Sequence, residues 1–97
     1  MPSDMQRSNA ALSGEIHGAS HLADLALLGG DVRATVDRRY PTLVQYADEI
    51  DKRAAFEYVD PALRLEFAGA FRRGFQRMLT ELSPTDAPYI MERAPVY

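Results

Sequence analysis

The sequence predicts an all-α protein: a small bundle of three main helices, the second kinked or split at Pro41 to give four helical pieces, followed by an extended C-terminal arm. Three observations predict this class. Apolar residues recur every three or four positions over most of the chain. Two dipeptides are typical of boundaries between consecutive helices, namely Gly29–Gly30 and Asp60–Pro61. The last fifteen residues contain three prolines, which prevents another regular helix of useful length.

Composition is that of one globular domain. Apolar residues make up 46% of the 97 residues and charged residues 26%, and the net charge of −3 supplies neither the broad positive field of a general nucleic-acid binder nor a strongly acidic surface. The absence of cysteine excludes disulfides and thiolate metal sites. The longest apolar run, 25–28, is too short to span a bilayer, and the first residues lack a signal-peptide pattern, so a cytoplasmic location without membrane contact is expected.

The first helix is expected from about Ala10, after a frayed, polar N-terminus over residues 1–9 in which Ser3 or Asp4 has the chemistry to cap an early turn. The single helical domain is predicted to begin with this helix and to span residues 10–82. The apolar stripe predicted for the first helix contains Leu12, Ile16, Ala19, Ala23 and Ala26, widened by Leu22, Leu25 and Leu28. Gly29 and Gly30 end this helix, and Asp31 is a good cap for the next one.

Two glycines interrupt the first helix. Gly14 and Gly18 each cost about 1 kcal/mol relative to alanine in a helix interior. Together with the neighbouring alanines they form a smooth side that would let a second helix approach closely. The sequence leaves two interpretations open: a close partner helix, or a frayed helix that becomes regular only near Ser13.

The second helical region keeps one apolar face across a proline. The residues of this face are Val32, Val36, Tyr40, Leu43, Ala47, Ile50 and Ala54. Pro41 removes an amide donor and clashes with the preceding turn, which costs about 3 kcal/mol in a straight helix. The sequence therefore predicts two pieces, 31–39 and 41–56, bent around one core.

The last helix has the strongest local signal. Asp60 is a suitable N-cap, and Pro61 then stands at the first helical position, where its missing donor would be unused. The helix is predicted to run to Leu82 and to form the spine of the domain.

The predicted core comprises Leu12, Ile16, Leu22, Leu25, Val36, Leu43, Ala47, Ile50, Leu63, Phe67, Phe71, Phe75, Met78 and Leu79.

The C-terminal arm, 83–97, is too apolar for a solvated tail. It carries Tyr89, Ile90, Met91, Val96 and Tyr97, so we expect it either to pack on its own domain or to dock onto a partner.

Two histidines and a carboxylate recur along the first helix. His17, His21 and Asp24 stand at i, i+4 and i+7, a spacing that would place three metal ligands on one side of a helix. The glutamate that follows the first histidine in a metalloprotease helix is missing here. A metal site is therefore a remote option, and two surface or interface histidines are the favoured interpretation.

Arginines and glycines of the last helix are the other candidates. Guanidinium groups on a rigid helix suit phosphates and carboxylates, and glycine inside a strong helix usually has a packing or functional reason. The predicted binding residues are Arg64, Gly69, Arg72, Arg73, Gly74 and Arg77 of this helix and Tyr89, Ile90, Met91 and Tyr97 of the arm.

No catalytic set, phosphate-binding loop or cofactor motif occurs in the sequence. The favoured function is a non-enzymatic protein-binding module, an adaptor or inhibitor of the kind that mobile elements encode, that occupies a surface of a larger protein and associates with itself. No cofactor is expected, and the partners are another protein and further copies of the chain. The alternative is a binder of nucleic acid or an anionic nucleotide through the arginines of the last helix.

Overall fold

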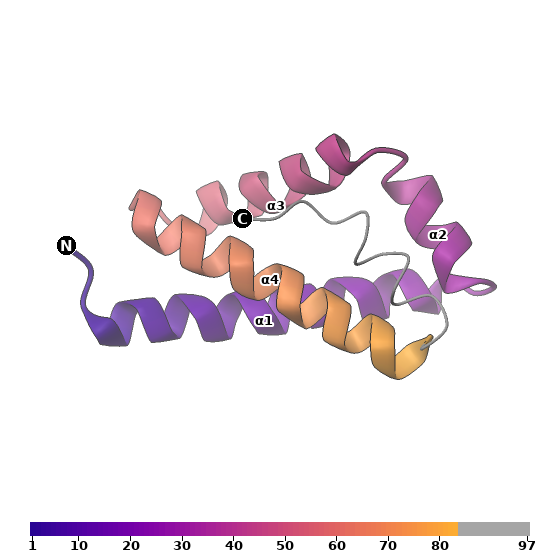
Figure 1. The fold of residues 1–97 in the computed structure, drawn as a ribbon, viewed down its shortest axis with the longest axis horizontal. Helices are drawn as coiled ribbons and strands as arrows, with labels where there is room; N and C mark the ends of the chain where they lie inside the picture. Colours follow the sequence, from indigo (N-terminus) through magenta and orange to yellow (C-terminus); the bar gives the residue numbers. More distant parts are fainter. Residues whose placement is uncertain (84–97) are drawn as a thin grey trace.

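The computed structural model describes residues 1–83, and their regular structure consists of four α-helices (Figure 1). The helices are α1 (Asp4–Leu27), α2 (Val32–Arg39), α3 (Leu43–Glu57) and α4 (Pro61–Leu82). This confirms the all-α class and the four helical pieces. Beyond Ser83, the predicted arm with Tyr89, Ile90, Met91 and Tyr97 lies outside the described residues. Within the described part, no helix is long and apolar enough to cross a membrane.

The start of α1 differs from the sequence prediction. The helix begins at Asp4, so residues 4–9 are helical and the expectation of a frayed N-terminus up to residue 9 is wrong for them. A capping box explains this: the Ser3 side chain accepts from the Gln6 amide while the Gln6 side chain accepts from the Ser3 amide. At the other end, Gly29 and Gly30 have φ angles of 87° and 78°, the left-handed conformation expected after a helix.

The break at Pro41 is confirmed, with a shift of boundary. Asp31 caps α2, which ends at Arg39, and Pro41 belongs to the link rather than to the next helix. Thr42 caps α3 in a second capping box with Gln45, so α3 begins two residues later than predicted. The predicted start of α4 is confirmed, since Asp60 accepts from the Ala62 amide and Pro61 is the first helical residue.

Helices α1 and α4 lie side by side and run in the same direction, and theirs is the most extensive contact between elements over residues 1–83 (Figure 1). A side chain at Gly14 or Gly18 would overlap the carbonyl oxygen of Phe67 or Phe71, and one at Gly74 would overlap that of Glu15. The backbones therefore touch. This resolves the two interpretations of the α1 glycines in favour of a close partner helix, and the partner belongs to the same chain.

The core forms where α2, α3 and the C-terminal half of α1 meet the phenylalanine face of α4. Its members are Leu22, Leu25, Val36, Tyr40, Tyr46, Ile50, Ala54, Phe67, Ala68, Phe71, Phe75 and Leu79. Val32, Tyr58 and Met78 pack against it as partly buried residues.

Three predicted core residues are exposed instead. Leu12 and Ile16 are 60% and 55% exposed because α1 turns its small residues, rather than this stripe, toward α4. Leu43 is 41% exposed because it is the first residue of α3, and Tyr46, one turn later, fills the core in its place.

Candidate functional site

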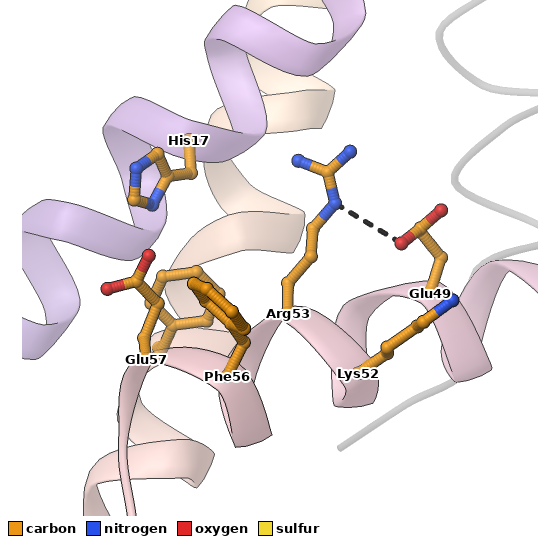
Figure 2. Close-up of a pocket in the computed structure, with 7 residues that line it drawn as sticks. His17, Glu49, Lys52, Arg53, Phe56 and Glu57 are labelled. Carbon is orange, nitrogen blue, oxygen red and sulfur yellow. Dashed lines mark hydrogen bonds and ion pairs between the residues drawn. The ribbon is translucent and has the colours of Figure 1, made fainter.

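A cleft between α1 and α3 is the candidate site (Figure 2). It has a volume of about 260 Å³ and is lined by His17 of α1, by Glu49, Lys52, Arg53, Phe56 and Glu57 of α3, and by Phe67 of α4. Figure 2 shows Arg53 and Glu57 projecting from α3 toward α1. The cleft exists because α1 and α3 each pack on α4 and make little contact with one another.

Phe56 is the most unusual residue of the cleft because its side chain is an aromatic ring that remains 88% exposed. It follows the buried Ala54 by two residues, which turns it about 200° around the helix and away from the core. The opposite side of the cleft holds the ring of His17, 5.5 Å from the buried ring of Phe67. Apolar ring surface therefore occurs both at the mouth and inside.

Arg53 is held in place from two sides. Its Nε lies 3.4 Å from Glu49 Oε2, and Glu49 Oε1 in turn lies 2.7 Å from Arg39 Nη2 at the end of α2. The guanidinium carbon also lies 5.4 Å from the centre of the Phe71 ring, a distance typical of a cation–π contact. These contacts orient the cation before any ligand arrives.

Behind the cleft lies a buried histidine. His21 Nε2 is 2.6 Å from the Tyr40 hydroxyl, and His21 Nδ1 is 3.3 Å from Arg53 Nη2. A guanidinium can only donate hydrogen bonds, so Nδ1 accepts, and in the neutral ring Nε2 carries the proton and donates to Tyr40. Burial, reinforced by the positive charge of Arg53, lowers the pKa of His21 to about 4. Burial also raises the pKa of Tyr40 to about 12, so both groups are neutral at pH 7.

The structure does not group His17, His21 and Asp24 in a way that could hold a metal ion. Both ring nitrogens of His21 already have hydrogen-bond partners in the core, and Asp24 lies on the exposed side of α1. His17 is directed into the cleft instead, with its Nδ1 3.4 Å from Ser13 Oγ. Throughout residues 1–83, no group of three His, Cys, Asp or Glu side chains is placed to hold a metal ion.

The arginines predicted to bind a ligand are spread around α4. Arg64 and Arg73 are nine residues apart, which places them on opposite sides of the helix. Arg64 donates to the Tyr58 carbonyl at 2.7 Å, and Arg77 forms ion pairs with Glu15 at 3.3 Å and Glu81 at 3.2 Å. Arg73 and Arg77, four residues apart, share a face. Ligand binding by Arg64, Arg72, Arg73 and Arg77 stays a prediction, but they do not form one cluster.

The two α4 glycines have different roles. Gly74 is buried against α1, whereas a side chain at Gly69 would meet only the tip of Arg73, at 3.6 Å. Gly74 is therefore occupied by packing within the chain, and Gly69 borders open surface.

The sequence prediction missed the cleft and Phe56. The available signal was the position of Phe56, which falls outside the apolar face of α3 that runs through Ile50 and Ala54. The cleft itself depends on how three helices are placed, and no local pattern encodes that. Comparison of the chain with models of known families, with curated proteins and with solved structures finds no match in any of the three.

Proposed function

We propose that the protein is a non-enzymatic protein-binding module that occupies a surface of a larger protein and receives one of that protein's large apolar side chains in the cleft between α1 and α3. The observation that carries this proposal is Phe56, an aromatic side chain left 88% exposed at the mouth of a preformed cleft. Burying a phenylalanine contributes about 1.5–3 kcal/mol, so a partner that covers this ring gains a substantial share of its affinity there.

The size of the cleft favours a side chain over a free small molecule. Its volume of about 260 Å³ lies below the roughly 300–1,000 Å³ of typical small-molecule sites. One large aliphatic or aromatic side chain is of suitable size, with Phe67 and the His17 ring beneath it.

The charged residues of the cleft support a specific orientation of the partner. Arg53 is already ordered by Glu49 and His21, so little side-chain entropy is lost when a partner packs on it. Lys52 and Glu57 stand at the rim with opposite charges. The best-matched partner presents its apolar side chain between an acidic residue that faces Lys52 and a basic residue that faces Glu57.

The test compares two equally exposed apolar residues of the full chain, Phe56 in the cleft and Val59 outside it, which is 89% exposed. Tagged wild-type protein, Phe56→Ser and Val59→Ser are used for affinity purification from cells of the source organism. The identified partner is then purified, and its affinity for each variant is measured by calorimetry. Phe56→Ser should weaken binding roughly 30-fold, the effect of an interface residue worth about 2 kcal/mol.

Val59→Ser should bind as the wild type does. A partner that binds Phe56→Ser as tightly as the wild type, or one that loses affinity equally with both variants, contradicts the cleft as the binding site. Failure of any protein to associate specifically contradicts the binding function itself.

A further inference from the structure

The face of α1 that points away from α4 carries no charged residue. The residues of this face are spaced three or four apart and form an outer stripe: Met5, Asn9, Leu12, Ile16, Ser20, Ala23 and Leu27. Met5 and Leu27 are 73% and 83% exposed, and Leu12 and Ile16 are more than half exposed. The solvent-facing side of α3 is different, since it carries Asp48, Asp51 and Lys52. A helix face this long, exposed and uncharged is typical of an interface rather than of a solvated surface.

Three of the four large residues of the outer stripe repeat at an interval of eleven. Met5, Ile16 and Leu27 are separated by eleven residues each. Eleven residues make close to three helical turns, so the three side chains lie almost on one line along the axis. That line is about 33 Å long at 1.5 Å per residue. A second straight helix can follow it from end to end.

We propose that a second copy of this chain packs antiparallel on the outer stripe, with a two-fold axis that passes near Ile16. In this arrangement Ile16 meets Ile16 of the second copy, and Met5 at one end meets Leu27 at the other. The intermediate positions then pair large with small side chains: Leu12 faces Ser20, and Asn9 faces Ala23. Such alternation lets two helices interdigitate, and a two-fold interface must be complementary to itself in this way.

A parallel pair fits the same stripe poorly. It would place Leu12 on Leu12 and Ser20 on Ser20, which gives crowding at one level and a gap two turns later. None of the residues paired along the stripe is charged, so desolvation of charge within the stripe does not oppose the antiparallel pair. A second copy on the outer stripe leaves the cleft accessible, because His17 of the cleft projects about 100° around α1 from Ile16.

The oligomeric state of the full chain tests the proposal. Sedimentation equilibrium should show a reversible dimer for the wild type. Ile16→Glu places two carboxylates at the axis and should raise the dimer dissociation constant at least tenfold. Leu65→Glu is the matched control because Leu65 is 66% exposed on α4, outside the stripe, and this variant should dimerise as the wild type does. Circular dichroism checks that both variants fold. If Ile16→Glu does not fold, Leu12→Glu is used in its place.

Single cysteines test the orientation, because the chain has none of its own. Ile16→Cys should form a disulfide-linked dimer under mild oxidation. Met5→Cys mixed with Leu27→Cys should form the linked heterodimer, whereas Met5→Cys alone should remain unlinked. Linkage of Met5→Cys to itself would show a parallel pair and overturn the proposed arrangement. A wild-type chain that sediments as a monomer at every concentration, or a dimer that Ile16→Glu leaves intact, would overturn the proposal as a whole.

Discussion

At the scale of single residues, the contact between α1 and α4 depends on glycines with backbone directly opposite them. A methyl group at position 18 would overlap the carbonyl oxygen of Phe71, which is part of a helix and cannot rotate away. Gly18→Ala should lower the free energy of unfolding by about 2 kcal/mol, because overpacking of 1–3 kcal/mol outweighs the gain in helix propensity of at most about 1 kcal/mol.

Gly69→Ala is the matched control in the same pair of helices. Its new methyl group would meet only the flexible Arg73 side chain, so the free energy of unfolding should rise by about 0.5–1 kcal/mol. Urea unfolding followed by circular dichroism measures both variants. If both substitutions raise the free energy of unfolding, or both lower it, the close approach of α4 is not the reason that α1 has a glycine at position 18.

The buried histidine predicts a dependence of stability on pH. The pKa of His21 is about 4 in the folded protein and 6.5 in an unfolded chain. Between these values the unfolded state binds more protons than the folded state, so stability falls as the pH is lowered from about 6.5 toward 4. The full effect is about 3 kcal/mol. Physically, a protonated ring would direct a second N–H at Arg53, and the carboxylates of Glu49 and Asp24 only partly offset that repulsion.

Thermal unfolding of the wild type and of His21→Gln between pH 7.5 and 4.5 measures this effect. The variant should be less stable at pH 7.5 but should lose less stability on acidification than the wild type does. In the wild type, the NMR titration of the His21 ring should have its midpoint well below 6.5. A midpoint at or above 6.5, or identical slopes for the two proteins, would contradict the buried neutral state.

At the scale of the elements, sequence predicts helix ends well and helix faces less well. Asp31, Asp60 and the Gly29–Gly30 pair act within about four residues of chain, so their effect on structure can be read locally. The predicted start of α1 is too late because the Ser3–Gln6 capping box stabilises a polar turn that has no apolar pattern.

The orientation of α1 is a property of two helices. The chain offers α1 a face of large residues, with Leu12 and Ile16, and a face of small residues, with Gly14 and Gly18. Periodicity alone favours the larger side chains for the core. The small face is buried instead because Gly74 on α4 provides a matching surface, and contact along two smooth helices brings many backbone atoms together. The candidate cleft could not be predicted for the same reason, since it requires the relative placement of α1, α3 and α4.

At the scale of the whole molecule, the helices are joined unequally. Helices α1 and α4 are in contact along much of their length, whereas α3 packs on α4 less extensively. The connection of α3 and of the end of α2 to α1 is made by the hydrogen bonds of His21 with Arg53 and Tyr40. An element with fewer buried contacts opens at a lower free energy than the rest. We therefore expect α2 and α3 to open together while α1 and α4 stay paired.

Native-state hydrogen exchange of the full chain tests this order, in the Ile16→Glu background so that association does not contribute to protection. Amides of α1 and α4 around their contact should exchange only through global unfolding, and amides of α3 through a smaller opening. Tyr40→Phe leaves the buried His21 N–H without its acceptor, which costs about 1–3 kcal/mol, and should lower the opening free energy of α3. Gly18→Ala should lower the opening free energy of α1 and α4. It should leave the opening free energy of α3 nearly unchanged, because α1 and α4 remain paired when α3 opens. Equal exchange free energies in α3 and α1 would mean that the four helices unfold as a single unit, with the histidine network as strong a connection as the backbone contact.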